Sequence, residues 1–326
     1  MDRRNFLKTG GIALLGSLAT GSAMALTTPG ALGGEGADKK AAVALAMNHF
    51  GVSEADLKKV LAAALEKGGD YADLFFEHTI SNSIRLMDGA VNNSYSNIDY
   101  GVGVRVLTGD QSGYAYVENI TVEDMLKAAR TAARIASANK GNKPLNLTEK
   151  ELKKNYYTVA SPWEEVSLKD KMPYLQKLND RIFALDKRVH KVQASQSDTT
   201  SHIFFCNSEG VMFYDYRPMV TLGAVCIMEE DGKTENGYAA RAYRRGFDFL
   251  SDEVVDVIAR EAVDQTSLLF KAIKPKGGEM PVVMGAGGSG ILLHEAIGHT
   301  FEADFNRKNV SCLLYTSDAA DDTPCV

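Results

Sequence analysis

Cysteine is scarce in this chain of 326 residues, which has only four. Four cysteines do not make the disulfide framework of a small secreted domain. Cys206 and Cys226 lie in clearly protein-like sequence, where they either pair across neighbouring strands or stay as buried free thiols. With 45% hydrophobic and 24% charged residues, the chain has the composition of an ordinary soluble protein with room for two or three domains.

A basic stripe and a long hydrophobic run are also missing. The net charge of −6 is mild and dispersed, which argues against nucleic acid as the main partner. The apolar run at residues 9–23 is too short and too rich in glycine for a stable transmembrane span. Arg241, Arg244 and Arg245 form a small basic cluster in a predicted loop, either a solvated surface cluster or a site for a substrate carboxylate.

The first 25 residues have the pattern of a twin-arginine signal peptide. Arg3 and Arg4 precede the weakly apolar run, and Ala23-Met24-Ala25 offers a small-x-small cleavage site. The pattern predicts export to the periplasm through the twin-arginine pathway, with an uncleaved N-terminal anchor as the alternative. Residues 26–49 are predicted to be a linker, because the segment after the cleavage site is rich in glycine.

Two α+β domains are predicted next. In residues 50–140, Ser53 caps a helix that reaches Lys67 and Thr121 caps a helix over 122–138. Turn sequences such as Asp88-Gly89 separate the predicted strands of this domain, at 71–77, 83–87, 100–107 and 113–117. A polar boundary follows, and residues 141–273 repeat the pattern, with helices at 167–183 and 252–271 and strands at 189–197, 201–207, 210–217 and 220–229. Antiparallel sheets flanked by helices define the α+β class.

A glycine run follows a linker at 274–279 and a predicted strand at 281–284. Gly285 to Gly290 matches the Gly-x-Gly-x-x-Gly pattern of dinucleotide-binding proteins. A Rossmann unit, however, carries this pattern at the first strand of a domain, with a ribose-binding acid about 20 residues further on. We therefore interpret the run as a tight turn, and a nucleotide-dependent oxidoreductase is the alternative.

The segment that carries chemistry is His294-Glu295-Ala-Ile-Gly298-His299, because neutral imidazoles bind zinc and a neighbouring carboxylate can accept a proton from water. Residues five apart lie about 140° apart around a regular helix, so one helix cannot direct both histidines at one ion. The spacing predicts a widened turn or a helix break, which Gly298 would tolerate. The alternative is two unrelated helix histidines.

The block from His294 to Asn306, with Tyr71–Glu77, Gly101–Arg105 and Gly109–Ala115, resembles the TldD/PmbA family of metalloproteases, and its TldD-type members in particular. The resemblance implies that His294 and His299 bind Zn²⁺ and that Glu295 is the general base. It implies a peptidase for small or unfolded peptides that works as a homodimer or as a heterodimer with a PmbA-type partner. It also implies that residues 274–311 begin a β-rich C-terminal domain, in which a distant cysteine is the third zinc ligand.

Two departures bear on activity. Residues 312–326 do not continue the family pattern and look like translated sequencing adapter, although a real tail is the alternative. Two histidines alone leave a catalytic zinc without its third protein ligand, and Glu302 is expected to orient His299 rather than to bind the metal. A non-catalytic peptide-binding subunit or an inactive fragment is therefore the alternative to an active enzyme. A dipeptidyl peptidase III-like enzyme, which takes its third ligand from a downstream glutamate, is a further one.

Overall fold

The computed structural model describes residues 39–136, 144–150 and 159–311. The chain divides into two compact units, Met1–Ala272 and Ile273–Val326. The predicted signal peptide, residues 26–38 of the predicted linker and the tail at 312–326 lie outside the described residues.

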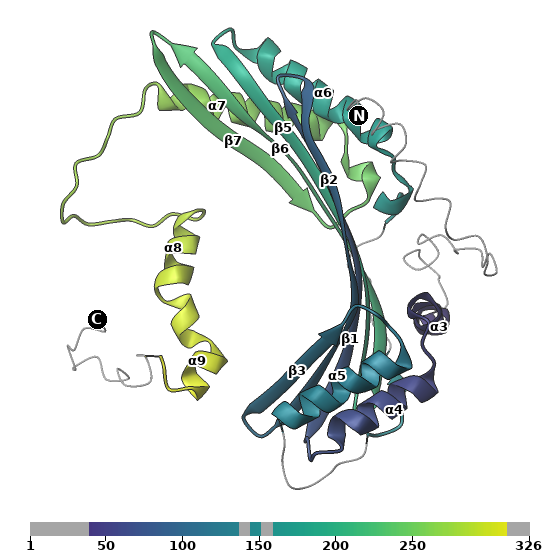
Figure 1. Ribbon diagram of the computed structural model, residues 1–326. Coiled ribbons are helices and arrows are strands. Elements are labelled where there is room, and N and C mark those ends of the chain that lie inside the picture. Colours follow the sequence, from purple (N-terminus) through teal and green to yellow (C-terminus); the bar gives the residue numbers. More distant parts are fainter. Residues whose placement is uncertain (1–38, 137–143, 151–158, 312–326) are drawn as a thin grey trace, which may run out of the picture. The chain divides into compact units, whose positions relative to one another are not determined.

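A single sheet of seven described strands forms the frame of the first unit (Figure 1). The strand order is β3-β2-β1-β5-β6, and β4 and β7 both pair with β6. Pairing is antiparallel except between β4 and β6. The strands are β1 (Tyr71–Met87), β2 (Ala90–Thr108), β3 (Gln111–Val117), β4 (Thr148–Glu149), β5 (Val189–Asn207), β6 (Val211–Glu230) and β7 (Lys233–Tyr243).

The predicted short strands merge into long ones. Residues 71–77 and 83–87 belong to the continuous strand β1, because the polar side chains between them find partners on β5. Thr79 Oγ1 donates to Ser201 Oγ at 2.8 Å, and Asn82 Nδ2 donates to Asp198 Oδ1 at 3.0 Å. The α+β class is as predicted, and the residues of the two predicted domains, 50–140 and 141–273, contribute strands to one sheet.

The loop predicted around the three arginines is wrong at Arg241, because this residue belongs to strand β7. Its guanidinium donates to Glu261 of helix α7 (Asp252–Leu269) at 2.5 Å. Arg245 lies beyond the strand and pairs with Asp248. These two cations are thus neutralised by partners within the chain, which weakens the interpretation as a site for a substrate carboxylate.

Helices pack on one face of the sheet (Figure 1). Two of them cover the end formed by β1, β2 and β3, and two cover the end that includes β7: α4 (Glu54–Leu65), α5 (Val122–Ile135), α6 (Leu168–Leu185) and α7 (Asp252–Leu269). The sequence signals for the helix starts hold. Ser53 and Thr121 accept hydrogen bonds from the backbone N–H groups of Asp56 and Asp124 at 3.2 and 3.1 Å.

Each pair of helices covers its own hydrophobic core. Leu57 and Phe204 belong to the core between the sheet and helices α4 and α5. Leu222 and Ile258 belong to the core between the sheet and helices α6 and α7. A buried polar band lies between the cores on the same strands. Its best-buried ion pair joins Lys171 Nζ and Asp198 Oδ2 at 2.6 Å, with side chains 4% and 1% exposed.

The predicted linker is wrong for residues 39–49, because these residues belong to helix α3 (Lys39–Phe50). Val43, Ala46 and Phe50 are buried in the first core. Their spacing of three and four residues places them on one side of a helix, so that the segment docks on the sheet. The stripe has only three buried positions, and the alanines around it favour a helix, a signal that the linker prediction did not use.

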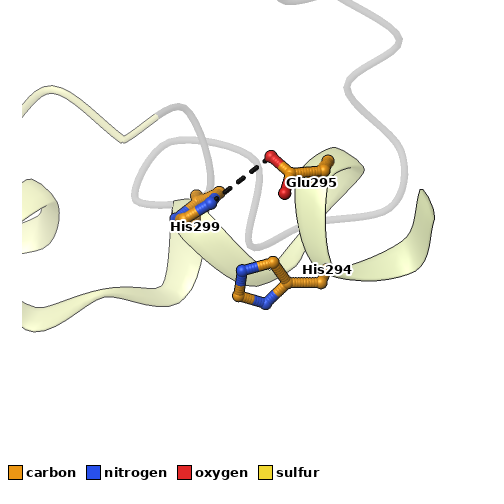
Figure 2. Close-up of side chains that lie close together, drawn as sticks. All are labelled: His294, Glu295 and His299. Carbon is orange, nitrogen blue, oxygen red and sulfur yellow. Dashed lines mark ion pairs between the residues drawn. The ribbon is translucent and has the colours of Figure 1, made fainter. Parts of the chain in front are cut away.

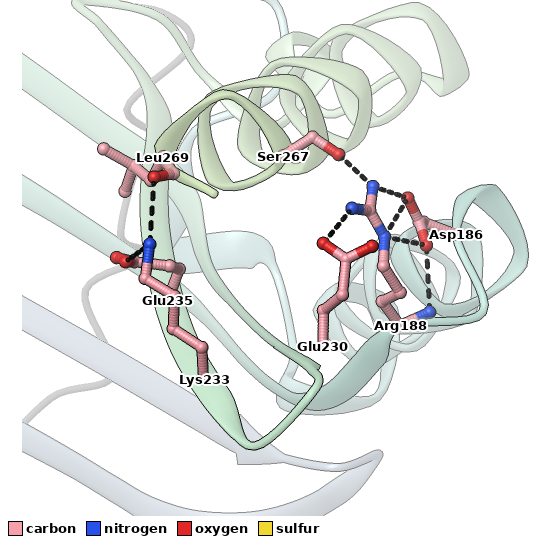
Figure 3. Close-up of polar contacts among 7 residues, drawn as sticks. All are labelled: Asp186, Arg188, Glu230, Lys233, Glu235, Ser267 and Leu269. Atoms are coloured by element: carbon pink, nitrogen blue, oxygen red, sulfur yellow. Dashed lines mark hydrogen bonds and ion pairs between the residues drawn. The ribbon is translucent and has the colours of Figure 1, made fainter. Parts of the chain in front are cut away.

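A polar network fastens α7 to the end of the sheet (Figure 3). Arg188 donates to Asp186 Oδ2 at 2.7 Å and to Glu230 Oε2 at 3.0 Å. The same guanidinium donates to Ser267 Oγ on α7 at 2.5 Å. One arginine therefore links the start of β5, the end of β6 and a helix.

The second unit has short helices and no buried hydrophobic residue in its described part, 273–311. Its elements are α8 (Ser289–Ala296), the 3₁₀ turn η3 (Gly298–Phe301) and α9 (Ala303–Arg307). The predicted strand at 281–284 is wrong, since this segment is irregular and Val283 is 97% exposed. A strand is stable only beside a partner strand, and residues 273–311 supply none. In the parts of the chain that the structure describes, no helix is both long and apolar enough to cross a membrane.

Candidate metal centre

The predicted helix break is confirmed between the two histidines. His294 and Glu295 lie in the last turn of α8, which ends at Ala296. Ile297 leaves helical geometry with φ −128° and ψ −40°, and His299 lies in the 3₁₀ turn that follows. The changed direction of the chain turns His299 towards the side of α8 that carries His294.

The break brings the three predicted site residues together (Figure 2). The ring centroids of His294 and His299 are 4.5 Å apart, and Nε2 of His299 lies 3.4 Å from Oε2 of Glu295. One ligand atom from each residue lies within 4.8 Å of the other two. Among the described residues, no other group of histidine, cysteine, aspartate or glutamate side chains has this geometry.

Gly298 contributes space rather than backbone freedom. The departure from helical geometry falls on Ile297, and Gly298 is not among the glycines with positive φ. A Cβ atom at position 298 would lie 3.1 Å from Nδ1 of His294, closer than an ordinary van der Waals contact. The glycine therefore lets the His294 ring lie against the backbone of the turn.

Glu302 lies beside His299, as the sequence predicted. Its Oε1 accepts a hydrogen bond from Nδ1 of His299 at 2.5 Å. This bond raises the pKa of His299, and the charges of Glu302 and Glu295 add to the effect. A carboxylate that holds one ring nitrogen fixes the tautomer and leaves the other nitrogen, Nε2, free to bind a metal.

The donor set fits zinc. Two imidazoles and a carboxylate are zinc ligands or neighbours in hydrolytic sites, where Zn–N distances are about 2.0–2.1 Å. A catalytic zinc takes three protein ligands and one water. His294 and His299 supply two, and the described residues bring no third histidine or cysteine to this group.

A second histidine group, which the sequence analysis missed, lies in the first unit, where His49 of α3 stacks on His78 of β1 and His202 of β5. Nε2 of His49 and Nδ1 of His78 are 2.9 Å apart. His202 is held by Tyr214 at 2.7 Å and by Glu164 at 3.0 Å. Because these ring nitrogens are already hydrogen bonded, we interpret the group as structural. The signal was hidden, since His78 and His202 become neighbours only through the pairing of β1 with β5.

Burial lowers the pKa of His49 to about 4, with repulsion from His202 and His78 adding to the effect. Burial, and repulsion from His202, likewise lower the pKa of His78. Both shifts favour the neutral form of the rings.

Cys206 and Cys226 are buried free thiols. They cannot pair across neighbouring strands, because Cys206 lies opposite Met212 and Cys226 lies opposite Val192, at different ends of the β5–β6 ladder. Burial raises the pKa of both thiols. They are packing residues of the two cores.

The glycine run does not form a dinucleotide site. The fingerprint requires a strand before its first glycine, and residues 281–284 form none. Instead, the Ser289 hydroxyl donates to the carbonyl oxygen of Gly285, and the backbone N–H of Gly290 donates to Gly287 at 2.9 Å. The run is a tight turn that leads into α8.

Comparison with known proteins identifies the family. Residues 72–136 match the family model described as "PmbA/TldA metallopeptidase domain 1", and residues 161–270 match "PmbA/TldA metallopeptidase central domain". The chain belongs to the PmbA/TldD family of metallopeptidases.

The names of similar curated proteins agree with this family assignment. A "Metalloprotease TldD homolog" of Haemophilus influenzae is 36% identical over 252 residues, which are 74% of this chain and 52% of the relative. A "Zinc metalloprotease TldD homolog" of Saccharolobus solfataricus is 24% identical over 253 residues, covering 76% and 53% of the two chains. The chain thus spans about half the length of the curated relatives it matches.

The crystal structure of TldE from Thermococcus kodakarensis has the same fold. The TM-score is 0.58 at 16% identity, over 79% of this chain and 57% of TldE.

Proposed function

We propose that the protein is a zinc-dependent peptidase that hydrolyses small or unfolded peptides. The observation that supports this most is the approach of His294, Glu295 and His299 at a helix break. The spacing His-Glu-x-x-x-His brings such residues together only when the helix is interrupted, and the chain belongs to a metallopeptidase family.

His294 and His299 would hold the zinc ion, with Glu302 keeping the His299 ring in the tautomer that leaves Nε2 free. Zinc supplies Lewis acidity, which lowers the pKa of a water molecule towards about 7 and polarises the scissile carbonyl group. Glu295 accepts the proton of the attacking water and passes it to the leaving amine. Its carboxylate is 3.4 Å from His299 Nε2, within reach of a water beside the metal.

A neutral Glu295→Gln variant tests the role of the glutamate. It should bind zinc like the parent and lose peptide hydrolysis, because an amide cannot accept the proton. Zinc content by mass spectrometry and cleavage of a quenched fluorescent peptide are the two readouts, and Glu279→Gln is the matched control. Unchanged cleavage by Glu295→Gln would remove Glu295 from the mechanism.

A non-catalytic peptide-binding subunit, or an inactive fragment, is the second candidate. It is favoured by the presence of two histidines and no third histidine or cysteine ligand in the group. In that case the active form would be an assembly that supplies the third ligand, as a homodimer or as a heterodimer with a PmbA-type partner. Zinc titration separates the candidates, since a chain that retains no zinc after dialysis cannot be the enzyme by itself.

Export through the twin-arginine pathway is part of the proposal and depends on Arg3 and Arg4. Residues 1–40 fused to a reporter should direct it to the periplasm. The Arg3→Lys/Arg4→Lys double variant should abolish export, and equal export of both fusions would exclude this route.

A further inference from the structure

The sheet of the first unit has an aromatic surface on the face opposite its helices. Leu74 and Phe76 of β1 are buried in the first core, and Phe75 between them points to the other face. Phe75, Tyr114 and Tyr116 are 36%, 57% and 67% exposed. Exposed aromatic side chains that lie together on one face are typical of a surface that binds a ligand or another protein.

Glycines on β2 form the floor of a groove of about 410 Å³ on this surface. Gly103 pairs with Phe75 on one side and with Tyr116 on the other. A Cβ atom at position 103 would lie 2.5 Å from the Tyr114 hydroxyl, so a side chain there would displace the Tyr114 ring. Gly103 in the Gly101–Arg105 segment, which the metal site does not use, therefore makes room for the Tyr114 side chain on this face of β2.

The charged residues that line the groove are all acidic. Glu77, Asp99 and Glu118 line it, and its lining residues include no lysine, arginine or histidine. Arg105, two positions along β2 from Gly103, does not offset these carboxylates, because it is paired with Asp73 at 2.6 Å. Carboxylates beside exposed aromatic faces attract a cation through both ion pairing and cation–π contact.

We infer that this aromatic–acidic groove binds a lysine or arginine side chain of a polypeptide. The apolar stem of such a side chain packs on Phe75 and Tyr116 while its charged end meets Glu77 or Glu118. The inference rests on the proposed function in taking a polypeptide as the ligand. It adds the chemical class of side chain that the first unit selects.

Binding of matched peptides tests the inference. A dye-labelled, extended Gly/Ser peptide with three lysines is compared by fluorescence anisotropy with the same peptide carrying three acetyl-lysines. The purified chain is used in EDTA, so that neither zinc nor hydrolysis contributes. The lysine peptide should bind about tenfold more tightly, since acetylation removes the charge and keeps the stem.

Variants locate the binding. Glu77→Gln/Glu118→Gln should lower affinity for the lysine peptide to that of the acetylated one, and Tyr116→Ser should lower it several-fold. The control Glu66→Gln/Glu209→Gln removes the same charge from exposed positions outside the groove and should bind like the parent. Circular dichroism checks that each variant is folded.

Equal binding of the two peptides, or parental affinity in Glu77→Gln/Glu118→Gln, would overturn the inference. Equal weakening by the control pair would overturn it too, because binding would then follow net charge alone. The measurement is independent of the metal centre, since it is made in EDTA and reads binding rather than hydrolysis. Failure of the groove and failure of the peptidase proposal are thus distinguished.

Discussion

The two units of this chain differ in what holds their side chains in place. In the first unit, long strands and helices bury two hydrophobic cores and a polar band between them. In the described part of the second unit, Ser311 is the one buried residue, and apolar side chains such as Leu293 and Phe301 are 53% and 66% exposed. The candidate metal centre lies in the second unit. The comparison teaches that local backbone geometry can bring ligands together without a core, while stability resides elsewhere in the chain.

Loss of a histidine ligand should have the largest effect on the second unit. His294→Ala and His299→Ala should each reduce bound zinc from one equivalent to nearly none, because one imidazole cannot retain the ion against dialysis. His190→Ala, an exposed histidine on β5, is the matched control. Zinc content after dialysis is the measurement, and full zinc occupancy in both ligand variants would place the metal elsewhere.

The same substitution in each unit tests the comparison directly. Leu57 of α4 is fully buried in the first core, whereas Leu292 of α8 is 62% exposed. Leu57→Ala should lower the free energy of unfolding by about 2–5 kcal/mol, whereas Leu292→Ala should change it by less than about 0.5 kcal/mol. Urea unfolding followed by circular dichroism gives both values. A large loss from Leu292→Ala would mean that the second unit has a core of its own.

Glu302 should matter for the metal and not for the fold. Glu302→Gln weakens the hydrogen bond to Nδ1 of His299, so zinc affinity should fall about 10–100-fold. Competition with a fluorescent zinc chelator measures the affinity. The unfolding transition of the first unit should stay unchanged, and a shift in that transition would break the proposed separation of the units.

Mild acid should destabilise the first unit through its histidines. Because the pKa of His49 is lowered to about 4 in the folded state and is near 6.5 when unfolded, the unfolded chain binds more protons between these values. The stabilisation is fully present above pH 6.5 and is lost as the pH falls towards 4. His78 acts in the same direction.

Urea midpoints at pH 7.5 and 5.5 measure this effect in a window above the titration of ordinary carboxylates. The parent should lose stability over this range, and His49→Gln should lose less. The control His190→Gln should behave like the parent. A parent midpoint that does not change with pH would contradict the assigned shifts.

Sequence predicted the features that depend on neighbouring residues. Ser53 and Thr121 fix helix starts through hydrogen bonds three residues away, and the turn at Asp88-Gly89 has the positive φ values of 50° and 79° that its sequence suggests. The break between His294 and His299 also follows from local arithmetic, because a regular helix cannot direct both at one ion.

Features that depend on strand register could not be predicted. The polar residues in the middle of β1 suggested an interruption, and only their partners on β5 explain why the strand continues. The histidine group could not be predicted for the same reason. His78 and His202 are 124 positions apart in the sequence, and only the register of β1 with β5 makes them neighbours. The strand predicted at 281–284 failed for the opposite reason, because its apolar residues have no partner strand in the described chain.

X-ray absorption at the zinc edge tests the central claim most directly. For the purified chain loaded with one equivalent of zinc, we expect scattering from two imidazole rings, with nitrogen at about 2.0–2.1 Å. The imidazole signal should fall in His294→Ala and in His299→Ala and persist in Glu295→Gln. A zinc spectrum without imidazole scattering, or one that neither histidine variant changes, would contradict the assignment of His294 and His299 as the metal ligands.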